Sequence, residues 1–204
     1  MKILIFIPHM GLGGVERSFI NLSKEFRRGG HNVKFVSLND IKSTYNEDIK
    51  HIKLNSKRTV FSINKLSKIF NYESPDLIIS AQYYANIIAV ISNKISKNKA
   101  KIIISERNHL SSELKKLNYF KRLIISSLVK FFYRKADLIY GNSDEVCNDL
   151  KKNFNLKIKI KKILNPSFTE NIDRLSKEKV HDEWITKANV PLLAYVGRLE
   201  PQKD

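Results

Sequence analysis

The sequence predicts an α/β protein with a doubly wound, mostly parallel sheet. Three observations lead to this prediction: short apolar runs rich in Ile and Val recur along the 204 residues, helix-length segments separate them, and a glycine-rich turn follows the first run. Strands joined through intervening helices connect by right-handed crossovers, which align them in parallel. The hydrophobic fraction of 42% fits the globular core that such a sheet needs.

The expected strands are apolar runs of the length that a buried parallel sheet uses. They are Lys2–Ile7, Val33–Leu38, Ile49–Leu54, Leu77–Ser80, Lys101–Ser105, Asp137–Gly141 and Ile158–Leu164. In the last of them lysines alternate with isoleucines, a pattern typical of a strand protected at the edge of a sheet.

Apolar residues at helical spacing predict the helices between these strands. Gly29-Gly30 ends the first helix, and Ser143 is an N-cap for a helix that continues through Leu150. The other expected helices lie around Ile63–Phe70, Asn86–Ile95 and Tyr119–Lys135.

The sequence becomes polar and loses its regular hydrophobic pattern after Asn165-Pro166. We expect residues 1–166 to form an N-terminal Rossmann-like domain and the polar residues 167–190 to form a linker with one or two short helices. The apolar run Leu192–Val196 then predicts the first strand of a second domain, so we interpret residues 191–204 as the truncated start of that domain.

The net charge of +17 gives information about the binding partners of the protein and not about its fold. Nucleic acid, an anionic membrane and an acidic substrate all fit it, and so does a general abundance of lysine on solvated faces. One cysteine cannot form an internal disulfide, which favours a reducing cytosol. The five histidines have no metal-ligand spacing, so we expect no metal. No apolar stretch reaches the roughly 18 residues of a spanning helix, so we expect a soluble or peripheral protein.

Several segments, in this order, resemble the retaining glycosyltransferases of glycosyltransferase family 4: "GLGGVERSFINLSKEF", "PDLIIS", "IISERN", "ADLIYGNSDEV", "KKILNPSF" and "AYVGRLEPQKD". The resemblance implies the GT-B architecture, in which an acceptor-binding N-terminal domain faces a donor-binding domain across a cleft. It also implies a nucleotide-sugar co-substrate, no other cofactor and no metal. The similarity is greatest to bacterial enzymes that extend lipid-linked or surface glycans, including lipopolysaccharide.

The turn after the first strand contains Gly13, Gly14 and Glu16. Glu16 stands where a dinucleotide fingerprint needs its third glycine, which argues against a nicotinamide- or flavin-dependent enzyme. The free N–H groups of a helix N-terminus remain available to a diphosphate or sugar. The resemblance implies Gly13 and Gly14 as substrate contacts, with Glu16 beside them; a tight turn with Glu16 opposing the helix dipole is the open alternative.

The segment "SERNHLSS" follows a central strand, at the edge where open α/β sheets bind ligands. A carboxylate, a guanidinium and an amide in succession suit the recognition of hydroxyls and phosphate. By resemblance, Arg107 occupies the place of a histidine that contacts the reacting sugar in many family members, and His109 follows two residues later. The catalytic candidates are therefore Glu106, Arg107 and His109, and Asn108 is a substrate-binding candidate.

Two cations near the end of the sequence, Arg198 and Lys203, match the pair that holds the donor diphosphate in the family. The leaving nucleoside diphosphate carries negative charge that fixed cations stabilise. Without the motif, two such cations would be interpreted as solvated.

The segment 115–135 mixes basic and aromatic residues. Such a helix is typical of an interfacial membrane contact, and an anionic membrane surface is the expected partner. The alternative left open is a helix packed on the sheet, with Leu123, Ile124, Leu128, Phe131 and Phe132 in the core and lysines reaching past them.

We therefore interpret the chain as the N-terminal half of a glycosyltransferase, inactive alone, that acts in the cytoplasm or peripherally on the inner face of the membrane. It would transfer a sugar from a nucleotide sugar onto a glycan or lipid-linked acceptor in the synthesis of bacterial surface polysaccharide or other glycoconjugates. The alternative is a non-catalytic basic α/β module that binds an anionic membrane, a glycan or nucleic acid. Nucleic acid is disfavoured, because no reading motif or aromatic strip is present.

Overall fold

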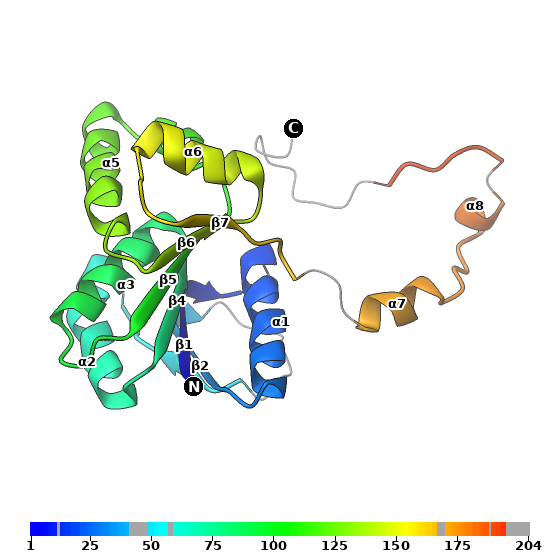
Figure 1. Cartoon of the computed structure of the whole chain (residues 1–204). Helices are drawn as coiled ribbons and strands as arrows, with labels where there is room; N and C mark the ends of the chain where they lie inside the picture. Colours follow the sequence, from blue (N-terminus) through cyan, green and yellow to red (C-terminus); the bar gives the residue numbers. More distant parts are fainter. Residues whose placement is uncertain (12, 41–48, 57–58, 167–169, 188, 195–204) are drawn as a thin grey trace. The chain divides into compact units, whose positions relative to one another are not determined.

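The computed structural model describes residues 1–11, 13–40, 49–56, 59–166, 170–187 and 189–194 (Figure 1). The chain forms two compact units, Met1–Ser167 and Phe168–Asp204. The first contains the sheet. In the second, the described residues form two short helices, α7 (Glu170–Ser176) and α8 (Glu183–Thr186).

The first unit is built on a seven-stranded sheet with the order β3-β2-β1-β4-β5-β6-β7. Every strand pairs in parallel with its neighbours. The strands are β1 (Lys2–Met10), β2 (Asn32–Asp40), β3 (His51–Lys53), β4 (Leu77–Ala81), β5 (Lys101–Glu106), β6 (Leu138–Gly141) and β7 (Ile160–Lys162). Because the chain leaves β1 toward β2 and then returns to β4 on the other side, the strand order reverses between β1 and β4.

Helices connect the strands. They are α1 (Gly14–Arg28), α2 (Ile63–Glu73), which the 3-10 turn η1 (Thr59–Ser62) precedes, α3 (Tyr83–Ile95), α4 (Leu110–Lys115), α5 (Tyr119–Tyr133) and α6 (Asp144–Phe154). In Figure 1, α1 lies on one side of the sheet, and α2 and α3 lie on the other.

Strand residues divide between two cores according to the two-residue period of a strand. On β5, Ile102 and Ile104 belong to the core beneath α2, α3 and α5, whereas Ile103 packs with the core beneath α1. The α1 core contains the fully buried Phe19 and Ile20 of the helix, together with Ile3, Ile5, Ile7 and Met10 of β1. This alternation decides to which face each residue at the end of a strand points.

The predicted fold class is confirmed, and the sheet is parallel in all its pairs. The prediction that the lysine-rich strand lies at an edge is confirmed too, since β7 ends the strand order. The Ser143 N-cap is also confirmed, because its hydroxyl accepts a hydrogen bond from the backbone N–H of Val146.

Several boundaries differ from the sequence prediction; β1 continues past Ile7 to Met10, for example, and β2 continues past Leu38 to Asp40. Two further differences have a clear physical reason. The helix expected around Asn86–Ile95 begins earlier, at Tyr83, because Gln82 turns the chain sharply in front of it. The expected strand Leu192–Val196 is wrong for residues 192–194, which are irregular; an apolar run alone does not make a strand without a hydrogen-bonded neighbour. The remainder of that run lies outside the described residues, as do Arg198 and Lys203.

Helix α5 exposes much of its apolar surface. Its core side is formed by Val129 and Tyr133, which are fully buried. The large apolar residues on its exposed surface are Tyr119, Phe120, Leu123, Ile124, Leu128 and Phe131. The open alternative that Leu123, Ile124, Leu128 and Phe131 are core residues is therefore wrong in this structure, whereas Phe132 does pack partly against the core. Across the described part of the chain, none of the helices has the length and apolarity that crossing a bilayer requires.

Candidate functional site

A pocket lies at the carboxyl ends of β1, β4 and β5, where the strand order reverses. Its volume is about 120 Å³, and its lining comes from the segments that follow those three strands. The lining residues are Val15, Gln82, Tyr83, Tyr84, Glu106, Arg107, Asn108 and Glu113. Open α/β sheets bind their ligands at this edge and beside this reversal, so we take this pocket as the candidate functional site.

The loop after β1 closes with the carboxylate of Glu16 folded back over its own helix terminus. Gly13 is the N-cap of α1, and a side chain placed on it would bring its Cβ within 2.3 Å of the Glu16 carboxylate. Gly14, by contrast, faces open space. An acidic group in the first turn offsets the positive end of the helix dipole. In this arrangement the loop is a poorer anion site than its glycines suggest.

Glu106 ends β5 and is buried in the core beneath α3 and α5. It continues the alternation of Ile102 and Ile104, so it points to that face. Its Oε1 accepts hydrogen bonds from the hydroxyl of Tyr133, the last residue of α5, and from Nδ2 of Asn86 at 2.9 Å. Burial raises the pKa of Glu106 to about 8, although the bonds from Tyr133 and Asn86 work against that rise.

Asn86 connects the ends of two strands and one helix to this carboxyl group. Its Oδ1 accepts from the Ser80 hydroxyl of β4 at 2.7 Å, and its Nδ2 donates to the Ser105 carbonyl of β5 at 3.0 Å. The same amide lies 3.1 Å from the Tyr133 hydroxyl. A buried polar network with all members paired holds β4, β5 and α5 in one geometry.

Gln82 and the two tyrosines form the side of the pocket that follows β4. Gln82 has φ 74° and ψ 135°, a conformation that non-glycine residues rarely adopt. Its Oε1 accepts a hydrogen bond from the Tyr84 hydroxyl. The Tyr83 and Tyr84 rings meet edge to face, with centroids 5.2 Å apart. Burial, followed by nearby negative charge, raises the pKa of Tyr84 to about 12, so the phenol keeps its proton.

Arg107 points to the opposite face of the sheet from Glu106, as the alternation requires. Its guanidinium lies 4.9 Å from the centroid of the Phe19 ring in the α1 core. It donates to the Ser105 hydroxyl at 3.0 Å, to the Ser18 hydroxyl at 3.2 Å and to Oδ1 of Asn165. The cation therefore ties β5, α1 and the segment after β7 together, and only part of it reaches the pocket.

Asn108 and Glu113 complete the rim. Nδ2 of Asn108 donates to Oε1 of Glu113 at 2.9 Å. Glu113 is placed by α4, whose residues Leu110 and Leu114 are buried. A residue of α6 fixes the first turn of α4: Oδ2 of Asp149 accepts a hydrogen bond from the backbone N–H of Ser111 at 3.0 Å.

His109 is the exposed N-cap of α4 and does not line the pocket. Although burial opposes it, the pKa of Asp149 on α6 is lowered by hydrogen bonds from Ser111 and Asn153 and by the charge of His109. His109 is thus close to α6. Of the four loop candidates, the structure brings Glu106, Arg107 and Asn108 to the pocket and places His109 apart.

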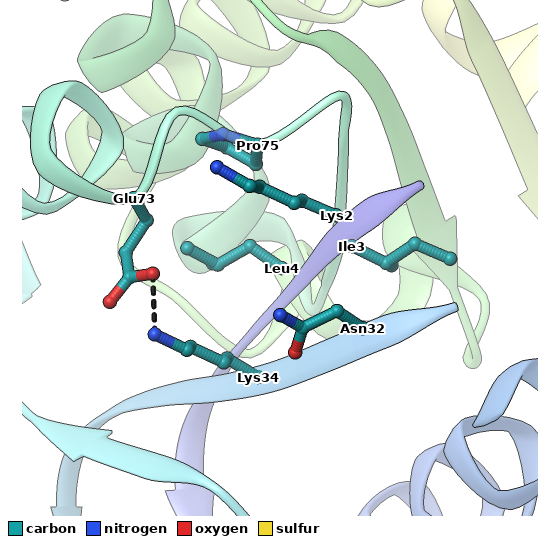
Figure 2. Close-up of a pocket in the computed structure, with 7 residues that line it drawn as sticks. All are labelled: Lys2, Ile3, Leu4, Asn32, Lys34, Glu73 and Pro75. Atoms are coloured by element: carbon teal, nitrogen blue, oxygen red, sulfur yellow. Dashed lines mark hydrogen bonds and ion pairs between the residues drawn. The ribbon is translucent and has the colours of Figure 1, made fainter. Parts of the chain in front are cut away.

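A second pocket, of about 220 Å³, lies at the amino ends of β1 and β2 (Figure 2). Figure 2 shows the ammonium of Lys34 directed at Glu73, and the two groups are 2.6 Å apart. The rest of its lining comes from Lys2, Ile3 and Leu4 of β1, Asn32 of β2, and Pro75. Because parallel sheets bind ligands at the opposite edge, we do not place the site here.

The sequence reasoning missed Gln82, Tyr83, Tyr84 and Glu113. The first three follow "PDLIIS" after one alanine, so their place at the carboxyl end of a central strand was the signal that could have found them. Glu113 lies one helical turn beyond His109 and carries no such signal.

Comparison with known proteins gives a consistent result. The sequence pattern described as Glycosyltransferase Family 4 matches residues 12–167. The chain is 27% identical, over 226 aligned positions, to the N-acetylgalactosamine-N,N'-diacetylbacillosaminyl-diphospho-undecaprenol 4-alpha-N-acetylgalactosaminyltransferase of Campylobacter jejuni. That alignment covers 100% of this chain and 56% of the relative, so the chain spans about half the length of the curated relative it matches.

Solved structures agree on the fold. The apo form of the lipopolysaccharide outer core galactosyltransferase WaaB superposes with a TM-score of 0.65 at 20% identity, covering 81% of this chain and 46% of that one. Anabaena Alr3699/HepE in complex with UDP superposes with a TM-score of 0.61 at 18% identity, covering 87% and 49%. The matched part is the N-terminal Rossmann-like half of the GT-B fold. Since the family pattern extends over more than half of its residues, this chain belongs to glycosyltransferase family 4.

Proposed function

We propose that this chain is the acceptor-binding half of a retaining glycosyltransferase that uses a nucleotide-sugar donor. The acceptor is a glycan or a lipid-linked glycan in the synthesis of a bacterial surface polysaccharide or glycoconjugate. The observation that carries the proposal is the pocket at the reversal of the strand order in a chain that belongs to family 4. The Campylobacter relative, whose name specifies a diphospho-undecaprenol acceptor, supports the lipid-linked class.

The proposed reaction divides its tasks between two parts of the enzyme. Family 4 enzymes typically use nucleotide-sugar donors without a metal, so the charge of the leaving diphosphate needs cationic side chains. Arg198 and Lys203 are proposed for that role and lie outside the described residues. The described pocket supplies the acceptor side, with Glu106, Arg107 and Asn108 in its lining and Gly13, Gly14 and Glu16 beside it. Among the residues of the loop after β5, Glu106, Arg107 and His109 are proposed for catalysis and Asn108 for contact with the substrate.

Isothermal titration of the purified chain tests this function with a detergent-solubilised undecaprenyl-diphosphate glycan, a UDP-sugar and a random oligonucleotide. We expect the glycan to bind and the UDP-sugar to bind far more weakly. Sugar transfer by this chain alone would contradict the division of tasks. Oligonucleotide binding that falls with salt, without binding of the glycan, would favour the basic binding module instead.

We further propose that α5 binds the cytoplasmic face of a membrane, and that the protein reaches its acceptor at this surface. Phe120, Ile124 and Phe131 lie on one side of the helix and are 75%, 59% and 60% exposed. Lys121 and Lys130 are exposed on the same helix, and the Lys135 ammonium lies 5.5 Å from the Phe131 ring centroid. Apolar side chains flanked by cations match an interface of acyl chains beneath anionic headgroups.

Vesicle sedimentation tests the membrane contact. The chain should sediment with vesicles containing phosphatidylglycerol and dissociate as salt rises, and Phe120→Ser with Phe131→Ser should abolish sedimentation. The matched control is Phe61→Ser with Tyr72→Ser, two exposed aromatic residues on η1 and α2. An equal loss of vesicle sedimentation in the two double variants would contradict the proposal that α5 is the specific membrane-binding surface. A salt-independent dimer that the first pair disrupts would identify a second copy as the occupant.

A further inference from the structure

We infer that the pocket formed by Gln82, Tyr83, Tyr84, Asn108 and Glu113 holds an uncharged sugar ring of the acceptor, and not a phosphate group. This inference rests on the proposed function and makes it more specific. It adds Gln82, Tyr83, Tyr84 and Glu113 to Asn108, which the sequence motifs had already indicated.

The first argument is the hydrogen-bonding character of the lining. A sugar hydroxyl both donates and accepts, so a sugar subsite needs donors and acceptors side by side. The pocket offers amides from Gln82 and Asn108, phenols from Tyr83 and Tyr84, and the carboxylate of Glu113. The edge-to-face pair of tyrosine rings adds apolar surface for the C–H groups of a pyranose.

The second argument is charge. Burial is the largest cause that raises the pKa of Tyr83 and of Tyr84. Glu113 raises the pKa of both phenols as well, after Tyr83 in the case of Tyr84, and Glu16 adds to the rise at Tyr84. Negative charge therefore surrounds the phenols, which favours hydroxyls that donate and disfavours a diphosphate. Arg107 is the one cation in the described lining, and its guanidinium already donates to Ser18, Ser105 and Asn165.

The third argument is backbone strain at Gln82. A non-glycine residue held at φ 74° costs free energy that the surrounding structure must offset, and such residues cluster at binding sites. The Tyr84 hydroxyl fixes the Gln82 side chain, so strain and hydrogen bond together present the amide at the pocket rim.

Amide chemical-shift mapping of the full 204-residue chain tests the inference. The probes are the methyl α-glycosides of glucose, galactose, N-acetylglucosamine and N-acetylgalactosamine, with inorganic pyrophosphate as the anion. We expect at least one glycoside, and not pyrophosphate, to shift amides in residues 82–86 and 108–113. Glu113→Gln and Tyr84→Phe should each weaken the binding of that glycoside about tenfold, because Glu113→Gln replaces a carboxylate acceptor with an amide donor and Tyr84→Phe removes a hydroxyl.

Matched controls are Glu145→Gln and Tyr72→Phe, which change the same groups at exposed positions outside the pocket. Unfolding temperatures of all four variants establish that they fold. No glycoside shift in this pocket, or pyrophosphate binding there, would overturn the inference. If the lipid-linked glycan still bound with undiminished affinity to Glu113→Gln, the subsite would be wrong while the proposed function stood. If that glycan did not bind the unaltered chain, the proposed function itself would fail.

Discussion

The two ends of the same sheet carry pockets of opposite character. The pocket at the amino ends of β1 and β2 is the larger, at about 220 Å³, and its Lys34 and Glu73 neutralise each other. The pocket at the carboxyl ends has about 120 Å³ and contains a buried carboxyl group, two tyrosines and a strained glutamine. Size therefore does not identify the site here.

The two ends of the sheet differ in whether they contain features that cost stability, such as a buried carboxyl group without a cation or a strained backbone. At the amino end, a half-buried ion pair satisfies both of its charges. At the carboxyl end, Glu106 is buried without a cationic hydrogen-bond partner in the described network, and Gln82 adopts a rarely populated conformation. Features that cost stability persist where the remaining structure holds them, and they concentrate at functional sites. Three substitutions test this contrast, from the largest expected effect to the smallest.

Glu106→Gln should remove a pH dependence of stability. The unfolded carboxyl loses its proton near pH 4.5 and the folded one near pH 8, so the folded state binds the extra proton between these values. The free energy of unfolding of the unaltered chain should therefore fall as pH rises through this range. Glutamine stays neutral at all these pH values. The free energy of unfolding of the variant should therefore rise relative to that of the unaltered chain as pH increases, by on the order of 3 kcal/mol by pH 8.

Urea unfolding followed by circular dichroism at about pH 5, 6.5 and 8 measures this difference. The single tryptophan is a poor reporter, because Trp184 lies outside the unit that contains the sheet. A constant difference between the two proteins at all three pH values would show that Glu106 is not protonated in the folded state.

Asn86→Ala should destabilise the carboxyl end by about 2 kcal/mol at neutral pH. The substitution leaves the Ser80 hydroxyl without its acceptor and removes a donor from the buried Glu106. The control is Asn98→Ala, because Asn98 is exposed and its amide hydrogen bond to Ser74 is exposed too. Equal losses of unfolding free energy in the two variants would mean that the network does not hold the site together.

The sequence was sufficient to predict most of this sheet and its edge. Apolar runs such as Lys2–Ile7 report burial on both faces, and that property does not depend on remote contacts. The alternating lysines of the last strand likewise place it at a border, where β7 is found. The loop after β5 could be singled out because its position after a central strand is a topological fact.

The rest depended on tertiary structure. Helical spacing alone cannot decide which side of α5 faces the sheet, since both sides carry apolar residues; Val129 and Tyr133 turned inward and Phe120 and Phe131 outward. The strained backbone at Gln82 has no signature in the sequence, so the start of α3 was placed three residues late. Residues 192–194 are as apolar as a strand but have no strand to pair with among the described residues.

Lys34→Met should have the smallest effect, and it tests the opposite end of the sheet. The ammonium of Lys34 contacts Glu73 at 2.6 Å with side chains 30% and 15% exposed, a partly solvated pair whose loss costs about 1 kcal/mol. Methionine keeps the aliphatic packing on β2, so urea unfolding should change little and glycoside binding at the other pocket should not change. A loss of glycoside affinity comparable to that of Glu113→Gln would contradict the assignment of function to the carboxyl edge. An unchanged affinity, with a small decrease in stability, would support the assignment of glycoside binding to the carboxyl edge.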